Sequence, residues 1–291
     1  MTSLDRREPL AGTASAVRAF LLIECSGPWG VEALRDSPLP QSVMQPLRRS
    51  AARHGVRPLL IRRHGRQQGG EGSGLRVFAA WTGPASPWLE TVQLTDPQEL
   101  IDLDLRPLAD GTTMGWEQHL DPVFLVCTHG RHDVCCAERG RPVARALSLS
   151  HPAQTWEVSH IGGDRFAANV LVLPDGLYYG RVDAATAPGL AATHLRGELD
   201  LERLRGRSCY GFAAQAAEIH LRRTIGLRTV RGLHLTGIKR AGNTTIASFT
   251  DGTQQWTVEV QRIAGDRTLL TCKSNRAEAP ILHRLVAIER G

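Results

Sequence analysis

The sequence predicts an α/β protein with two related α/β units, followed by a small α+β element at the C-terminus. Apolar runs of strand length alternate with segments at helical spacing, and the order strand–helix–strand–strand occurs twice. Past Arg207 the pattern changes to a helix and short alternating strands. Of the 291 residues, 42% are hydrophobic and 22% charged, as in ordinary globular proteins. The expected domains are residues 16–110, 117–207 and 208–291.

The first unit is expected to begin with a buried strand, because Ala16–Glu24 is an apolar run of strand length. A Gly/Pro loop at Ser26–Gly30 follows it, and the apolar spacing then predicts a helix over about Gln41–His54. Two further strands are expected at Arg57–Arg63 and Leu75–Trp81 because both are rich in apolar residues. The glycine-rich segment RQQGGEGSG between them is interpreted as a flexible hairpin loop, and Asp96–Asp104 as helical or irregular.

The second unit is expected to repeat this order. It opens with an apolar strand at Pro122–Cys127, and Cys136–Ser148 carries apolar residues at helical spacing. Both units open with an apolar run that ends in a cysteine, Cys25 and Cys127, which supports a relation between them. The remaining predicted elements are strands at Trp156–His160, Asn169–Leu173 and Leu177–Val182, a tight turn at Pro174–Gly176, and a helix at Ala184–Leu195.

The C-terminal part follows an arginine-rich connection at Gly197–Arg207. Phe212–Ile225 has the apolar spacing of an amphipathic helix. Alternating segments with turn residues between them then predict strands near His234–Arg240, Thr244–Thr250, Gln255–Gln261 and Thr268–Lys273.

Charge and hydropathy exclude several classes of protein. The net charge is +6, but the arginines are spread along the chain and aromatic residues make up only 5%, so we expect no nucleic-acid partner. No apolar run approaches the length of a transmembrane helix, so we expect no membrane insertion. The charged N-terminus has no apolar segment behind it; we therefore expect no secretory signal and a cytoplasmic location. The oligomeric state is unknown.

The cysteines and histidines point to metal chemistry. In a reducing compartment, clustered cysteines indicate metal or redox sites rather than structural disulfides. Cys127 and Cys136 bracket eight residues where a strand gives way to a helix, and His160 and Asp164 follow with Gly162–Gly163 between them. Cysteine with histidine suits zinc or an iron–sulfur cluster. The long spacing between the cysteines argues against ordinary zinc modules, whose paired cysteines have only about two to four residues between them.

The chain resembles the sucrase/ferredoxin-like family in CTHGRHDVCC (Cys127–Cys136), in the segment Trp156–Val182 and in GPWG at Gly27–Gly30. The similarity runs over most of the chain and is densest at Cys127–Val182. The resemblance implies two thioredoxin-like units, the second a thioredoxin-like ferredoxin domain that binds a 2Fe–2S cluster. It also implies Cys127, Cys136 and His160 as ligands, with Asp164 where the family has a second histidine.

The aspartate would make the oxidised cluster more negative than a second neutral histidine would. We therefore expect a reduction potential between those of His-ligated Rieske centres, from about −150 mV upward, and plant-type ferredoxins, at about −400 mV. The fourth ligand could instead be Cys135, His129, His132, Cys25 or a water, or the position could be open. Asp164 would then cap a turn or pair with an arginine.

The leading functional hypothesis is an electron-transfer protein that exchanges electrons with a redox partner protein, a reductase or an electron acceptor. On this hypothesis we expect the chain to act as an electron carrier rather than as a catalyst. A second hypothesis is a thiol–disulfide oxidoreductase on a thioredoxin-like scaffold, although the thioredoxin-type C-x-x-C is absent. A third is a structural zinc-binding module. Metal content and colour of the protein purified without oxygen separate the three.

Overall fold

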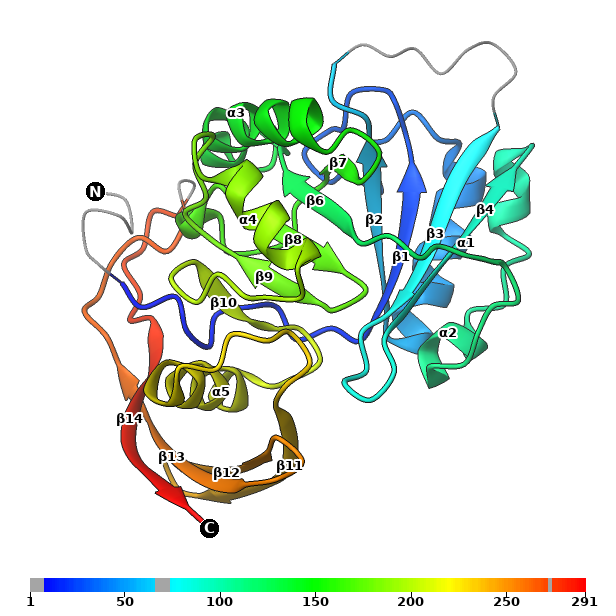
Figure 1. The fold of residues 1–291 in the computed structure, drawn as a ribbon. Coiled ribbons are helices and arrows are strands. Elements are labelled where there is room, and N and C mark those ends of the chain that lie inside the picture. Colours follow the sequence, from blue (N-terminus) through cyan, green and yellow to red (C-terminus); the bar gives the residue numbers. More distant parts are fainter. Residues whose placement is uncertain (1–7, 66–73, 272–273) are drawn as a thin grey trace.

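The structure, a computed structural model, describes residues 8–65, 74–271 and 274–291. Ten strands form one large curled sheet, and four more form a separate antiparallel sheet (Figure 1). The α/β class predicted from the sequence is thus confirmed. The predicted glycine-rich loop lies, apart from Gly74, outside the described residues.

The first half of the large sheet holds a parallel pair and an antiparallel extension. Strand β2 runs parallel to β1, β3 pairs antiparallel with the other side of β1, and β4 pairs antiparallel with β3. Helix α1 keeps its predicted bounds because it ends at Gly55, which adopts the left-handed conformation that favours glycine. Strand β4 was not predicted. The elements are β1 (Ala19–Glu24), α1 (Gln41–His54), β2 (Val56–Arg62), β3 (Leu75–Trp81) and β4 (Trp88–Leu94).

The second half repeats the same order of elements and of strands. Strand β7 runs parallel to β6, β8 pairs antiparallel with the other side of β6, and β9 pairs antiparallel with β8. The order β7–β6–β8–β9 therefore matches β2–β1–β3–β4. These elements are β6 (Val123–Cys127), α3 (Val134–Ser150), β7 (Thr155–Val158), β8 (Val170–Leu173) and β9 (Leu177–Tyr179).

The two halves join through β2 and β7, which pair antiparallel with Ile61 opposite Val158 and Arg62 opposite Glu157. The predicted domains 16–110 and 117–207 thus contribute to one continuous sheet, with order β10-β9-β8-β6-β7-β2-β1-β3-β4-β5. Strand β10 lies in the segment predicted to be only a connection. The other elements are η1 (Pro97–Leu100), α2 (Arg106–Asp110), β5 (Glu117–Gln118), η2 (Asp164–Phe166), α4 (Ala187–Leu195) and β10 (Leu204–Arg207).

The core holds the two halves of the large sheet together. One buried cluster takes side chains from both halves, among them Phe20 and Ile61 from the first and Leu125 and Val158 from the second. Alternate residues of the same strands face the helices instead, so both faces of the central strands are apolar. Cys127 belongs to the shared cluster, whereas Cys25 lies in the cluster under α1. The two strand-end cysteines therefore occupy different environments.

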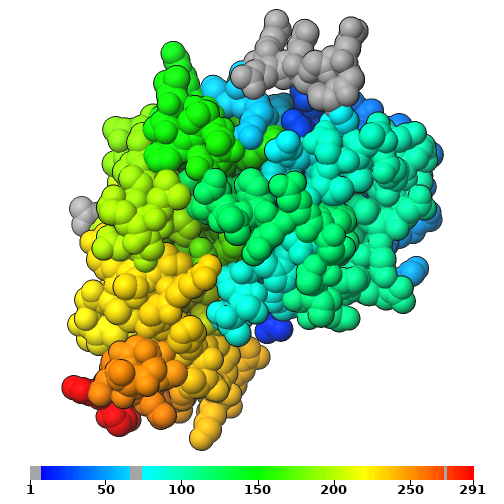
Figure 2. All heavy atoms as spheres, turned by 45° about the vertical axis from the view of Figure 1, so that its right-hand side comes forward, coloured from blue at the N-terminus to red at the C-terminus, as the bar shows by residue number. Residues whose placement is uncertain are grey.

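The C-terminal element forms the lower lobe in Figures 1 and 2. Helix α5 (Phe212–Ile225) has its predicted bounds and packs on a sheet of β11 (His234–Ala241), β12 (Thr244–Thr250), β13 (Gln255–Ala264) and β14 (Ile281–Arg290). The strand predicted at Thr268–Lys273 was wrong over its described part: Thr268 makes only an isolated bridge to Glu278. Lys273 lies outside the described residues. The fourth strand comes later because β14 supplies the continuous partner for β13.

No helix in the described ranges is both long and apolar enough to cross a membrane.

Candidate metal centre

Two cysteines meet where β6 ends and α3 begins. Cys127 is the last residue of β6, and Cys136 lies in the first turn of α3; both are buried. The helix starts where it does because the Asp133 carboxylate accepts a hydrogen bond from the Cys135 backbone N–H at 2.9 Å. The predicted change from strand to helix therefore fixes both sulfur positions.

Gly140 allows α3 to approach the end of β6. A Cβ atom at this position would lie 2.1 Å from the carbonyl oxygen of Cys127. No real Cβ contact is that short, so the helix would have to move away from the strand that carries Cys127. The glycine thus sets the distance between the two cysteine-bearing elements.

Replacing Gly140 with alanine is expected to destabilise the fold and to lower metal affinity by about tenfold or more. The displacement of α3 outweighs alanine's helix-propensity advantage of about 1 kcal/mol. Thermal unfolding and a metal competition titration measure the two effects. Gly189→Ala is the control, because a Cβ atom at this position of α4 would have no neighbour within 4 Å. Equal stability and affinity in both variants would contradict this role of Gly140.

His160 completes a group of three ligand atoms. Strand β7 runs parallel to β6 with Val158 opposite Cys127, so the residues that follow β7 emerge beside that cysteine. The Nδ1 atom of His160 lies 3.8 Å from the Cys136 sulfur. Ligand atoms of Cys127, Cys136 and His160 all lie within 4.8 Å of one another. The structure thus brings together three of the four residues predicted as ligands.

Asp164, the fourth predicted ligand, lies beside this group but not in it. It begins η2, after a turn in which Gly162 and Gly163 both have positive φ angles. Its carboxyl group is buried and contacts that of Asp133. Burial, and then the neighbouring Asp133, raise the pKa of Asp164, and the charge of His160 partly offsets this. Asp164 is therefore a near neighbour of the three grouped ligand atoms.

The Cys136 thiol lies close enough to Cys127 to donate a hydrogen bond to its sulfur. The pKa of Cys127 is lowered, because it accepts a hydrogen bond from the Cys136 thiol and a further one from His160. The pKa of Cys136 is raised because its proton is held by Cys127 and because the side chain is buried. A metal ion needs deprotonated thiols, so its charge would take the place of this proton. The pair is chemically suited to a cation.

Two more histidines lie close to His160. The sequence offered both as alternatives for the fourth ligand. The His132 ring stacks on that of His160 with 3.9 Å between centroids. His129 accepts a hydrogen bond at Nδ1 from the His160 backbone N–H and donates one from Nε2 to Gly30. Burial lowers the pKa of His129, which favours the neutral ring that these bonds require. His129 therefore positions His160, a supporting role that its place in the loop between the two cysteines already suggested.

Cys135 and Cys25 are the two cysteines that the sequence offered as a fourth ligand. Cys135 is partly exposed, although its neighbour Cys136 is buried. Cys25 lies beside Trp29, whose indole N–H donates to the Cys25 carbonyl oxygen. Neither sulfur belongs to the group formed by Cys127, Cys136 and His160.

Glu157 joins the two halves of the sheet beside this centre. Its carboxylate accepts hydrogen bonds from Thr128 at 2.8 Å and from Arg62 at 2.9 Å, and contacts His64 Nδ1 at 2.7 Å. Burial alone would raise the pKa of Glu157. The charge of Arg62 and the bonds from His64 and Thr128 outweigh burial and hold that pKa below its ordinary value of 4.5.

Replacing Glu157 with glutamine is expected to cost about 2 kcal/mol of unfolding free energy at neutral pH, because charged hydrogen bonds are lost. A carboxyl group with a lowered folded pKa stabilises the protein above its ordinary pKa and loses that contribution as the pH falls through the folded value. The difference from wild type should therefore shrink below about pH 4. Urea unfolding at several pH values measures it. Exposed Glu117→Gln is the control, and a pH-independent difference would contradict the charge-based explanation.

The fold and this centre define an α/β protein with a candidate Cys/Cys/His metal site. The sequence profile of the sucrase/ferredoxin-like family matches residues 10–206, which includes all three grouped ligands. The chain belongs to this family.

The chain is also similar to Altered inheritance of mitochondria protein 32 from the yeast Meyerozyma guilliermondii. The two are 29% identical over 97 residues, which cover 30% of this chain and 34% of the relative. The chain thus matches about a third of that relative's length. No solved structure matches.

Proposed function

We propose that the protein is an electron carrier with a 2Fe–2S cluster held by Cys127, Cys136, His160 and Asp164. The observation that carries this proposal is the convergence of two buried sulfurs and an imidazole within 4.8 Å, from three separate segments of the chain. Membership of a family described as ferredoxin-like supports it.

The donor set fits such a group chemically. Thiolate and imidazole ligands suit iron–sulfur centres, and Cys127, Cys136 and His160 offer two sulfurs and an imidazole in one group. Asp164 supplies a further anionic oxygen donor from the turn after His160. When bound, the cluster would supply one-electron oxidation and reduction. The residues of the chain hold it, keep water from the sulfurs and orient His160 through His129.

The topology supports a thioredoxin-like ferredoxin domain in the second half and a related unit in the first. Each half consists of a parallel βαβ unit followed by a β-hairpin, with the same strand order. His160 is partly exposed while both cysteines are buried, so electrons would leave toward a redox partner protein at the histidine side. We place the protein in the cytoplasm, where a reducing environment would keep the five described cysteines out of disulfides.

Purification without oxygen tests the proposal. The expected result is a red-brown protein with about two irons and two sulfides per chain and an EPR signal after reduction. A colourless protein without iron would overturn it.

A single zinc ion is the second candidate, and the compactness of the group favours it. Three ligand atoms within 4.8 Å of one another fit one tetrahedral ion with a fourth ligand or water. A colourless protein with about one zinc per chain would select zinc over the cluster.

Asp164→His is expected to shift the optical and EPR spectra of the iron-loaded protein and to raise its reduction potential, because a neutral ligand replaces an anionic one. Asp164→Asn tests whether the charge or the position matters. Redox titration measures the change, with Asp104→Asn, an exposed aspartate, as the control. Unchanged spectra in Asp164→His would show that this side chain only contacts Asp133.

A further inference from the structure

A large pocket opens beside His160, at the junction of the two halves. Its cavity volume is about 1090 Å³, slightly above the usual range of small-molecule sites, which ends at about 1,000 Å³. The first half contributes the starts of β1 and β2, one side of α1 and the loop after β1. The second half contributes His129, His132, Ser159 and His160. The candidate metal centre thus lies at one wall of the pocket. The pocket itself is not needed to coordinate a metal.

The pocket carries a strong positive charge, and we call it the arginine pocket. Five arginines line it, and the described lining residues include a single acidic side chain, Glu32. A concave surface lined by one sign of charge concentrates ions of the opposite sign. The five are Arg18, Arg35, Arg48, Arg49 and Arg57.

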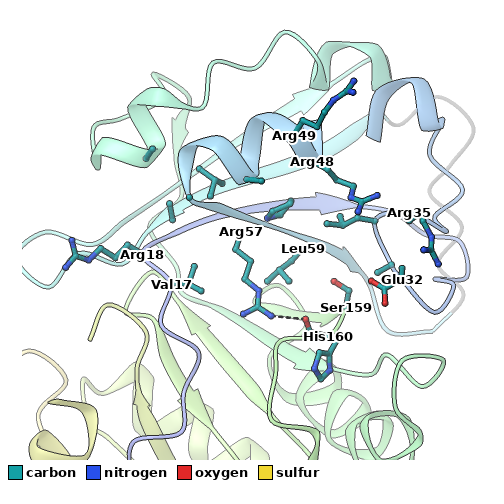
Figure 3. Close-up of a pocket in the computed structure, with 18 of the residues that line it drawn as sticks. Val17, Arg18, Glu32, Arg35, Arg48, Arg49, Arg57, Leu59, Ser159 and His160 are labelled. Carbon is teal, nitrogen blue, oxygen red and sulfur yellow. Dashed lines mark hydrogen bonds between the residues drawn. The ribbon is translucent and has the colours of Figure 1, made fainter. Parts of the chain in front are cut away.

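Much of this hydrogen-bonding capacity is unused. Arg57 points toward the metal centre and donates to the His160 carbonyl at 3.2 Å (Figure 3), and Arg35 pairs with Asp36. Within the described ranges, no hydrogen bond or ion pair engages the guanidinium groups of Arg18, Arg48 and Arg49. Arg48 extends toward the side of the pocket where Arg35 lies (Figure 3). Planar guanidinium groups bind carboxylates and phosphates through paired hydrogen bonds.

The pocket also has an apolar wall. Val17, Leu34, Leu59 and Trp81 line it together with the arginines. A site that mixes apolar walls with a few charged donors matches an organic molecule better than a bare inorganic ion.

We propose that the arginine pocket binds a small organic anion, an apolar body with a carboxylate or phosphate group, beside His160. Arg57 beside His160 and Arg48 on the Arg35 side offer guanidinium donors for the anionic group at two places in the pocket, and the apolar wall accommodates the body of the molecule. Binding itself does not depend on the metal. We also expect an occupied pocket to change the spectrum of the metal centre, and this expectation rests on the proposed function.

Calorimetric titration of the purified protein with AMP and with benzoate tests the proposal and separates phosphate from carboxylate chemistry. At least one of the two compounds should bind. If AMP binds, adenosine and inorganic phosphate should each bind about tenfold or more weakly than AMP. Arg48→Gln with Arg57→Gln should weaken binding by about tenfold or more. Arg53→Gln is the matched control for Arg48→Gln: each removes one positive charge from α1, but Arg53 does not line the pocket, so its loss should leave affinity unchanged.

Absence of binding by both probes, or an equal loss in Arg53→Gln, would overturn the proposal. A glutamate-rich peptide that binds through Arg48 and Arg57 when neither small anion does would instead assign the pocket to a protein partner. The same titration on Cys136→Ser separates this inference from the proposed function. Anion binding that persists in that variant supports the pocket, whatever metal the wild-type protein contains.

Discussion

Cys136→Ser is expected to abolish iron binding, with less than about a tenth of the wild-type iron content retained. Serine leaves the fold of α3 in place but removes one of the two sulfurs that share the candidate site. A serine hydroxyl is far less acidic than a thiol, so a bound metal does not deprotonate it as readily and it cannot replace the thiolate. Iron and sulfide analysis after anaerobic purification, with the visible spectrum, measures the loss.

Cys135→Ser is the matched control for this experiment. It makes the same chemical change one residue earlier in the same helical turn, at a sulfur outside the group of ligand atoms. It should keep the iron and the spectrum of the wild type. Loss of iron in Cys135→Ser with retention in Cys136→Ser would reverse the assignment of the two neighbouring cysteines. Circular dichroism of both variants shows whether each is folded.

Glu218→Ala is expected to destabilise the protein by about 3–5 kcal/mol, because it leaves buried arginines without their counter-charge. Glu218 on α5 pairs with Arg222 at 2.9 Å and lies 3.7 Å from Arg207 on β10. All three side chains are buried, and Arg222 is fully so. In a protein of this size we expect the Tm to fall by about 10 °C. Differential scanning calorimetry measures it.

Asp104→Ala removes the carboxylate of an exposed ion pair with Arg106 and serves as the comparison. Solvent screens that pair, so its loss should change the Tm far less. Glu218→Gln should give an intermediate loss, since an amide can still accept a hydrogen bond from Arg222. Equal effects of Glu218→Ala and Asp104→Ala would show that burial of the α5–β10 cluster adds nothing to stability.

Local patterns were enough to predict much of the fold. Helices α1 and α5 have the predicted bounds, because an amphipathic pattern ends in each case at a left-handed glycine, Gly55 and Gly226. Strand β14 was missed because all of its residues are exposed or half-exposed, so its apolar contrast is weak. The β2–β7 pairing was not predicted either, since it joins residues about a hundred positions apart and leaves no local signal.

The candidate site was predictable to a similar extent. The change from strand to helix places Cys127 and Cys136, and the parallel β7 brings His160 to the same sheet edge. The contact of Asp164 with Asp133 depends on the conformation of the Gly162–Gly163 turn and on side-chain packing, which residue spacing does not encode. The contacts of His129 with His160 and Gly30 bring together three separate segments, and only the folded chain shows them.

The shared β2–β7 junction limits how this molecule can be dissected. A fragment that began after residue 116 would keep Cys127, Cys136 and His160 but would leave β7 with β6 as its one neighbour, because β2 would be lost. The backbone donors and acceptors on that side of β7 would then be exposed, and a bare strand edge invites association with other chains. Experiments on the metal centre therefore require both halves in one polypeptide.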